Sequence, residues 1–476
     1  MPQPNDPQEH LRQVQELLAR QRLVENLVHR QTMPRHELVE GLLHKQHRVE
    51  LQQRLDALHP ADIAYILEAL PIEDRLRVWE MVRADQDGDI LLEVSDAVRG
   101  ILIEDMEPEE LLAAAEHLDA DELADLAPDL PPEILREVID GLDHQSRRQV
   151  HAAMSYPEDQ VGACMDFDMV TLRHEVSLEV VLRYLRRRKA LPDHTDKLFV
   201  IDRHERLLGM LTLEALLTRD PEQTVGEAMD PGALPRFHPE EKVTDAAHAF
   251  ERYDLISAPV VDGQGRLIGR LTVADMVDVI RDRSDQEILG QAGLQEEEDI
   301  FAPVWGSVRN RWIWLAVNMA TAILASRVIA YFEDAIGQLV ALAALMPIVA
   351  GIGGNSGNQT ITLIVRALAT GQVGRGGTRR LLRKEVGVAL INGLFWGGFL
   401  GLLAWWLYGK PELGLVMTAA MLLNLLLAAA AGVLIPMLRH RFGQDPALGS
   451  SVLITALTDS GGFFIFLGLA SVFLLG

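Results

Sequence analysis

Residues 206–213 read RLLGMLTL and residues 266–273 read RLIGRLTV, so the same stretch returns after 60 residues. Each copy follows an apolar run that ends in aspartate, at 198–202 and at 258–262. Short apolar runs bounded by turn residues are typical of β-strands, and a stretch with helical spacing follows each copy. The repeat therefore predicts two similar units of strand, turn, strand and helix.

This tandem resembles a pair of CBS modules, which we place at residues 158–224 and 225–283. The resemblance to CBS pairs implies that the tandem can be a nucleotide sensor. In such sensors a Thr-x-x-Asp sequence at the end of the second strand can hold a ribose and a phosphate. The second copy has Thr272 and Asp275, whereas the first has Thr212 followed by Ala215. The resemblance implies one nucleotide site, with ATP as the candidate ligand. The alternative is a dimerisation and regulatory scaffold.

An acidic α-helical N-domain is predicted at residues 36–157, before the CBS modules. Apolar residues recur there with helical spacing, and four prolines fall at expected helix starts, namely Pro60, Pro71, Pro108 and Pro131. The pattern is typical of an α-solenoid of helical hairpins. Residues 1–35 read as a polar N-terminal extension without the apolar core of a signal peptide, so we expect this half of the chain to stay in the cytosol.

Charge is distributed unevenly along the chain. Residues 301–476 carry 12 Lys+Arg and 6 Asp+Glu, whereas residues 1–300 carry 32 and 63. The acidic half is unsuited to nucleic acid, because phosphate contacts need Lys and Arg. Its acid either provides solubility or collects cations. The single cysteine, Cys164, excludes an internal disulfide and a cysteine-based zinc site.

Five apolar runs dominate the C-terminal part, and each is long enough to cross a bilayer core, which takes about 20 residues. Positive residues flank these runs on alternate sides. Arg309 precedes the first run, Arg380 lies between the second and the third, and Arg439 lies between the fourth and the fifth. Because positive charge collects in cytoplasmic loops, a five-helix all-α transmembrane pore domain at 309–476 would have its N-terminus in the cytosol and its C-terminus in the periplasm. The runs are 312–329, 339–368, 386–407, 413–438 and 448–475.

Asp459 is the single carboxylate inside these runs. A charge at this depth needs a wet cavity or a partner, and no Lys or Arg lies near the middle of any run. A mobile cation is the expected partner, and the alternative is a protonated structural aspartate. Mg²⁺ usually keeps several of its waters, so a pore shared by two chains would place two such carboxylates around one hydrated ion.

The second run contains GIGGNSGNQT at residues 351–360. Its glycines let helices approach closely, and its amides offer uncharged oxygen ligands. Helix packing and pore lining both remain open for Gly353 and Gly357, whereas Asn424 is expected to bond between helices. The candidate pore-lining residues are Gly353, Gly354, Asn355, Asn358, Gln359 and Thr458.

The order of acidic helical domain, CBS pair, charged helix and five runs, with GGNSGNQ at 353–359 and the Thr458-Asp459 pair, resembles the MgtE family of bacterial magnesium channels. The resemblance covers about residues 35–476. It implies a homodimer in the lipid of the bacterial inner membrane, with Mg²⁺ as substrate and regulator. It also implies that Asp459 binds the ion in the pore and that a connecting, plug-like helix at 284–308 holds the gate shut.

The same resemblance implies regulatory magnesium ligands in the acidic half and before the fifth run, at Asp121, Asp125, Gly162, Asp254, Asp275, Asp278 and Asp445. Acidic residues three or four apart share a helix face and repel unless a cation bridges them. The alternative is a solvated acidic face. Another family cluster of carboxylates falls here on Lys242, Thr244, Arg283 and Gln286, so we expect that site to be lost.

The sequence therefore predicts a Mg²⁺-selective channel gated by cytosolic Mg²⁺. Two alternatives stay open: a broader divalent-cation transporter that also carries Mn²⁺ or Co²⁺, and a nucleotide-sensing membrane scaffold without transport. An enzyme is not expected, because the sequence has no P-loop, nucleophile elbow or histidine-rich metal motif.

Overall fold

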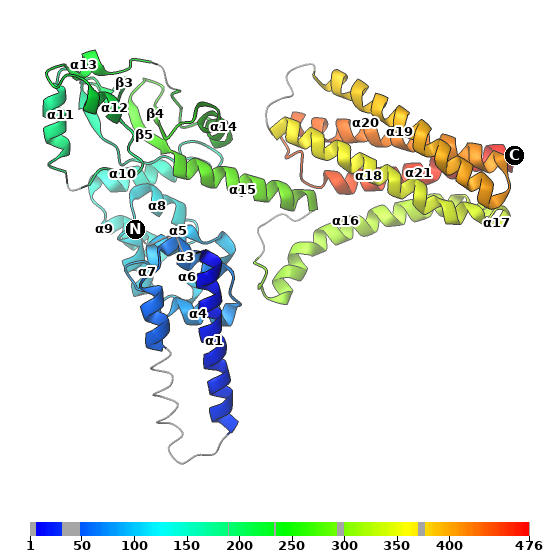
Figure 1. Ribbon diagram of the computed structural model, residues 1–476, viewed down its shortest axis with the longest axis horizontal. Coiled ribbons are helices and arrows are strands. Elements are labelled where there is room, and N and C mark those ends of the chain that lie inside the picture. Colours follow the sequence, from blue (N-terminus) through cyan, green and yellow to red (C-terminus); the bar gives the residue numbers. More distant parts are fainter. Residues whose placement is uncertain are drawn as a thin grey trace. The chain divides into compact units, whose positions relative to one another are not determined.

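A computed structural model describes residues 6–30, 48–188, 190–232, 235–292, 299–369 and 377–475. The chain divides into two compact units. The N-terminal unit comprises Met1–Arg283 with Glu298–Ala302, and the C-terminal unit comprises Ser284–Glu297 with Pro303–Gly476. Figure 1 labels most elements of both units.

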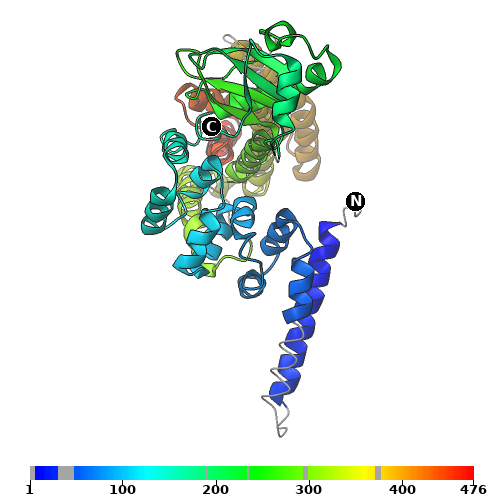
Figure 2. The ribbon, with the colours of Figure 1, turned by 90° about the vertical axis from the view of Figure 1, so that its left-hand side faces the viewer.

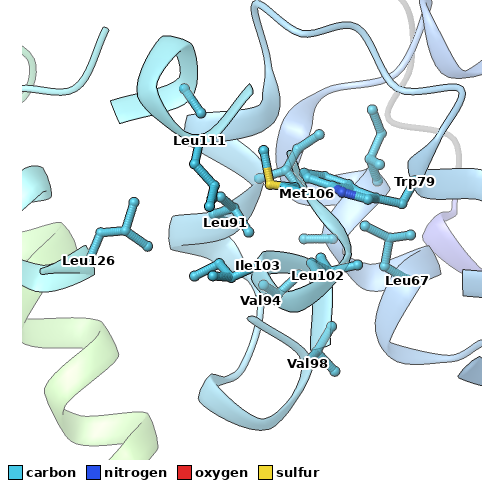
Figure 3. Packing of buried hydrophobic residues seen from close by; sticks show 14 of the residues in the cluster. Leu67, Trp79, Leu91, Val94, Val98, Leu102, Ile103, Met106, Leu111 and Leu126 are labelled. Atoms are coloured by element: carbon cyan, nitrogen blue, oxygen red, sulfur yellow. The ribbon is translucent and has the colours of Figure 1, made fainter. Parts of the chain in front are cut away.

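The N-domain is a series of short helices around one apolar core. Pro60 and Pro108 open α3 and α7, while Pro71 and Pro131 directly precede α4 and α9, as predicted. Figure 3 shows how this core is packed. The helices are α1 (Pro7–Arg30), α3 (Pro60–Glu68), α4 (Ile72–Trp79), α5 (Asp87–Glu93), α6 (Asp96–Asp105), α7 (Pro108–Ala115), α8 (Ala120–Leu126), α9 (Pro132–Gly141) and α10 (His144–Ala153).

Helix α1 lies in the region that the sequence marks as an extension, and it contributes to this same core. Val14 and Leu18 are buried in it together with Leu51 and Leu55. Figure 2 shows α1 running alongside the first helices of the N-domain. The extension is therefore packed against the N-domain around Val14 and Leu18.

The CBS region confirms the predicted repeat of strand, turn, strand and helix. Lys197 pairs with Thr212 and Ser257 with Thr272, so the two antiparallel registers are 60 residues apart, and each hairpin has its irregularity at the equivalent step. The strands form the sheets β1-β2-β3 and β4-β5. The elements are β1 (Thr171–Arg173), α11 (Leu178–Leu185), β2 (Lys197–Ile201), β3 (Leu207–Thr212), α12 (Leu213–Thr218), α13 (Val225–Ala228), α14 (Val243–Tyr253), β4 (Ser257–Val261) and β5 (Leu267–Thr272).

Long helices make up the C-terminal unit. Helix α20 contacts α18, α19 and α21, and these four run alongside one another in Figure 1. Its small and apolar residues are largely buried, which suits a central position in a bundle. The helices are α16 (Val304–Tyr331), α17 (Glu333–Gln338), α18 (Ala341–Ala369), α19 (Gly377–Tyr408), α20 (Pro411–Arg441) and α21 (Ser450–Leu474).

Four of the described helices, α16, α19, α20 and α21, are long and apolar enough to cross a membrane. The run predicted at 339–368 forms the 29-residue α18. It is not among the four, although its length is comparable, because the polar stretch from Asn355 to Thr360 lowers its hydropathy. The prediction of five spans is thus supported for four of them.

The predicted connecting helix continues the last CBS helix without a break. Helix α15 (Val273–Ala292) runs past Arg283, and residues 293–298 lie outside the described part of the chain. Within the C-terminal unit, Gly290 near the end of α15 accepts a hydrogen bond at 3.4 Å from the backbone N–H of Gly449, at the N-cap of α21. The end of α15 therefore meets the start of the helix that carries Asp459.

Candidate cation sites

Asp459 lies near the middle of α21 and is half-buried within the single chain. Its neighbour Thr458 is fully buried and donates its hydroxyl to the carbonyls of Ile454 and Thr455, at 2.9 and 3.2 Å. That hydroxyl also faces α18, since a Cβ on Gly354 would lie 3.5 Å from it. Asp459 is thus carried on a helix whose buried face packs against the glycine-rich stretch of α18.

Glycines of α18 and its neighbours mark the closest helix contacts. A Cβ on Gly353 would lie 2.2 Å from the amide nitrogen of Asn424 in α20, and one on Gly357 would lie 2.6 Å from Ile454 in α21. The packing interpretation of these two glycines is therefore supported. Asn424 also donates from Nδ2 to the carbonyl of Val349 at 2.9 Å, the interhelical bond that the sequence suggested.

The amides of the α18 motif point to different surroundings. Asn358 accepts a hydrogen bond from the Ser451 hydroxyl of α21 at 3.0 Å. Asn355 and Gln359, four residues apart and hence on one helix face, are exposed in the single chain. The amide groups of these two residues are therefore accessible on the surface of the single chain.

A second buried carboxylate corrects the premise that Asp459 stands alone. Helix α19 begins at Gly377, well before the apolar run expected from residue 386, and so includes Glu385, which is 6% exposed. Its carboxylate accepts from the Thr360 hydroxyl of α18 at 3.2 Å and lies 3.1 Å from the Lys384 ammonium. The sequence does show this carboxylate, because Glu385 lies one residue before the apolar run that was expected from residue 386.

The acidic helix α8 of the N-domain faces carboxylates of the CBS region within the N-terminal unit. Burial, followed by the charges of Asp166, Glu122 and Asp275, raises the pKa of Asp121 to about 8. Two of these three carboxylates belong to the CBS region. The structure therefore brings Asp121 of the N-domain and Asp275 of the CBS region into one electrostatic environment.

Two further predicted ligands belong to the same acidic cluster. Desolvation by the surrounding protein, opposed by Arg99, and the charges of Asp96, Asp129 and then Asp282 raise the pKa of Asp125, although its side chain is 65% exposed. Burial and then the charges of Asp282 and Glu93 raise the pKa of Asp278. The cluster thus combines N-domain acids with acids on α15. No group of three or more His, Cys, Asp or Glu residues in the described ranges is arranged to hold a metal ion, so these carboxylates are neighbours without being a preformed ligand shell.

The remaining predicted regulatory ligands have other surroundings. Gly162 is buried against the Tyr156 ring, and its N–H donates to the carbonyl of Pro239 at 2.9 Å. Asp254 is exposed and ends α14 in a left-handed conformation, with φ of 51°. Asp445 belongs to the C-terminal unit, where it accepts from the Ala447 N–H at 2.8 Å before α21. Neither Asp254 nor Asp445 is among the main charges that shift the pKa of Asp121, Asp125 or Asp278.

The positions of the family cluster expected to be lost are dispersed along the CBS region. Lys242 is the N-cap of α14, next to Thr244, whereas Arg283 and Gln286 lie on α15. The loss of that cluster, at positions where Lys242 and Arg283 are basic, stays a prediction drawn from the resemblance.

The predicted nucleotide pair is formed at the end of the second CBS hairpin. The carboxylate of Asp275 accepts from the Thr272 N–H at 3.0 Å and from its hydroxyl at 2.8 Å. In the first module, Thr212 instead caps α12 by accepting from the Ala215 N–H at 3.1 Å. Only the second module thus presents a carboxylate at this place, and that carboxylate is shared with the acidic cluster.

Comparisons with known proteins agree with this division of the chain. Residues 346–469 match the family model MgtE, described as a divalent cation transporter, and residues 58–159 match the MgtE intracellular N domain. Two CBS domains match at residues 161–222 and 224–282. The fold and its matched modules define a divalent-cation transporter with a CBS-containing N-terminal unit.

Two relatives match over nearly their whole length. The magnesium transporter MgtE of Thermus thermophilus is 32% identical over 448 residues, which cover 90% of this chain and 98% of the relative. That of Bacillus subtilis is 26% identical over 420 residues, covering 88% and 93%. A solved structure of the cytosolic domain of the Mg²⁺ channel MgtE in complex with ATP is 29% identical, with a TM-score of 0.45, and covers 50% of this chain and 98% of that chain. The chain belongs to the MgtE family of magnesium transporters.

Proposed function

We propose that this chain is a Mg²⁺-selective channel that works as a homodimer in the bacterial inner membrane. The observation that carries the proposal is the placement of Asp459, half-buried in the middle of an apolar helix whose other face packs on the polar motif of α18. A carboxylate at that depth needs a cation or a wet cavity. Two copies would supply two carboxylates and the exposed amides of Asn355 and Gln359 around one hydrated ion.

In this proposal α18 is the fifth membrane crossing. Its polar motif would line the pore instead of facing lipid, which accounts for its low hydropathy. Five crossings leave the N-terminal unit in the cytosol and the C-terminus in the periplasm. The basic residues in the first turns of α19 and in the last turn of α20, such as Arg380 and Arg439, support this orientation, whereas Arg375 lies outside the described residues.

Cytosolic Mg²⁺ is proposed to close the channel. Burial, and then the charges of neighbouring carboxylates that include Asp275 of α15, raise the pKa of Asp121, so the charged form of this N-domain acid is disfavoured where it lies. A cation that bridges these carboxylates favours the arrangement in which they are close, and a ligand shifts an equilibrium only by such a preference. The hydrogen bond between Gly449 and Gly290 supports α15 as the element that acts on the start of α21.

Ion flux in liposomes tests the transport proposal. The full-length chain should carry Mg²⁺, and Asp459→Ala should lower the flux by about tenfold or more. Asp334→Asn, which changes an exposed carboxylate of α17, is the matched control and should keep the wild-type flux. Unaltered Mg²⁺ flux in Asp459→Ala would remove that residue from the pore, and equal flux of Mn²⁺ or Co²⁺ would favour the broader transporter.

Protease protection tests the gating proposal separately. Raising Mg²⁺ should slow cleavage of the N-terminal unit in the wild type, and Asp121→Asn with Asp275→Asn should weaken this protection. Identical cleavage at low and high Mg²⁺ would contradict gating by this cluster and leave transport untouched. Equilibrium binding of ATP to the wild type and to Asp275→Ala tests the nucleotide site, for which Thr272 and Asp275 are the proposed residues.

A further inference from the structure

Three arginines of the N-domain make the same hydrogen bonds at equivalent positions. Each is the fourth residue of the second helix in a helical hairpin, in α4, α6 and α10. Each donates from Nε to the carbonyl eight residues earlier and from Nη2 to the carbonyl five residues earlier. The bonds are Arg75 to Leu67 and Leu70 at 2.8 and 3.1 Å, Arg99 to Leu91 and Val94 at 2.8 and 3.4 Å, and Arg147 to Ile139 and Leu142 at 2.9 and 3.3 Å.

This repeated contact, which we call the arginine socket, satisfies carbonyls at the end of the preceding helix. Cations are favoured there, because the last carbonyls lack helical partners and carry partial negative charge. The socket leaves Nη1 of the guanidinium free to meet an acid. Arg99 uses it for Asp129, at 3.2 Å, inside the N-domain.

Arg75 uses its Nη1 for a residue that lies far away in the sequence. It donates at 2.7 Å to Asp299, 224 residues further along and beyond both CBS modules. Both side chains are buried, Arg75 at 0% and Asp299 at 3% exposure. Asp299 also accepts from the Phe301 N–H at 2.9 Å, which fixes the turn that follows it.

Asp299 stands at the entry to the first long helix of the C-terminal unit. The segment Glu298–Ala302 belongs to the N-terminal unit, yet Pro303 is the N-cap of α16. Four residues reach at most about 14 Å when fully extended. The ion pair therefore holds a residue that lies four positions before the N-cap of α16.

The ionic character of this contact calls for an explanation beyond stability. A buried ion pair pays for desolvation and is often no more stable than an apolar pair of the same size, although it specifies one partner and one geometry. The neighbouring residue, Asp74, is also paired over a long range, with Arg22 of α1. Helix α4 thus forms ion pairs with two distant parts of the chain, at Arg22 and at Asp299.

We propose that Arg75 and Asp299 form a positioning contact through which the N-domain holds the entry to α16. This contact gives the N-domain a second mechanical connection to the membrane helices, in addition to the continuous helix α15. In its regulatory part the proposal rests on the proposed function: the cation-dependent state of the N-domain acts on α16 through Asp299. Loss of the contact would uncouple the N-domain from α16 and leave the residues of the pore unchanged.

The test compares two acids that occupy the same kind of socket. Asp299→Asn removes the charge that holds the α16 entry, whereas Asp129→Asn removes the equivalent charge within the N-domain. Asp299→Glu is the conservative rescue. Hydrogen–deuterium exchange of the full-length protein in liposomes, over residues 299–310, reports the contact directly. The Mg²⁺ concentration that halves the flux reports the coupling.

The proposal expects Asp299→Asn to speed exchange at the start of α16 by about tenfold and to raise the half-closing Mg²⁺ concentration, with low-Mg²⁺ flux unchanged. Asp129→Asn should leave exchange over residues 299–310 as in the wild type, and Asp299→Glu should restore both the exchange and the half-closing Mg²⁺ concentration. Unchanged exchange in Asp299→Asn, or an equal effect of Asp129→Asn, would overturn the contact. Faster exchange with an unshifted half-closing concentration would overturn the coupling. A wild-type chain without Mg²⁺ flux would instead refute the proposed function, and the exchange result would still decide the contact.

Discussion

The Thr360 hydroxyl of α18 donates to the carboxylate of Glu385 in α19 at 3.2 Å, with both side chains almost fully buried. A Cβ on Gly432 of α20 would lie 2.8 Å from the Cβ of Thr360, so three helices meet at this point. The polar motif of α18 is therefore anchored at its C-terminal end by a hydrogen bond and a close contact.

This hydrogen bond should contribute to the stability of the bundle. Glu385→Ala removes the acceptor and should cost about 1–3 kcal/mol, while Glu385→Gln keeps an acceptor oxygen and should cost less. Thermal unfolding in detergent, followed by size-exclusion chromatography, measures both. Equal losses for the two variants would show that the charge, rather than the accepted hydrogen bond, matters here.

Two glycines of α18 provide a matched test of helix packing. Gly353→Ala places a methyl group 2.2 Å from Asn424 and should destabilise the bundle by about 1–3 kcal/mol. Gly351→Ala meets nothing within 4 Å and should be neutral or stabilise by up to about 1 kcal/mol. The same unfolding assay compares them, and equal stability of the two variants would contradict the close contact.

Stability of the N-domain should depend on pH through Asp87. Burial, and then the charges of Glu110 and Asp85, raise its pKa from 3.8 to about 7. The folded state binds this proton more tightly than the unfolded chain does. The contribution is therefore full below pH 3.8 and is lost as pH rises through about 7. Asp87→Asn should remove this loss and stabilise α5 by about 1–2 kcal/mol at about pH 8.

Hydrogen exchange of α5 between acid and neutral pH measures the effect of Asp87, after correction for the intrinsic exchange rate. The exposed Asp89 of the same helix is the control, and Asp89→Asn should leave the pH dependence as in the wild type. A pH dependence that survives in Asp87→Asn would assign it to other groups.

Helix α1 should be held by its apolar face. Leu18 is 3% exposed and Leu23 is 61% exposed on the same helix. Leu18→Ala should cost about 2–4 kcal/mol of local stability, whereas Leu23→Ala should stay within about 0.5 kcal/mol. Limited proteolysis of residues 7–23 distinguishes them, and equal cleavage would show that α1 is not docked through Leu18.

Local patterns account for the parts of this fold that the sequence could predict. The 60-residue repeat sets both hairpin registers, because strand alternation and turn residues act over a few neighbours. The prolines at helix starts likewise act on the backbone next to them. The glycine-rich motif of α18 is also a local pattern, and its polar residues lower the hydropathy of that helix below that of the four candidate spans.

Pairings between distant residues could not be predicted in this way. Glu385 lies just outside the expected apolar run, and the sequence does not show that it is buried. Its partner, Thr360, is 25 residues away on another helix. Arg75 and Asp299 are unremarkable in the sequence and meet only because a hairpin and a linker fold together. Helical spacing made Asp121 and Asp275 candidate ligands one by one, but how their charges act on one another depends on burial, which a single sequence does not give.

The pairing of Arg75 with Asp299 also orders events during synthesis of the chain. At about 5–20 residues per second, the ribosome needs roughly 10 to 45 seconds to add the intervening 224 residues. Until then the first hairpin of the N-domain carries a guanidinium without its acid. The hairpin is completed as α16 is translated, so maturation of this part of the N-domain is timed to the arrival of the first long apolar helix.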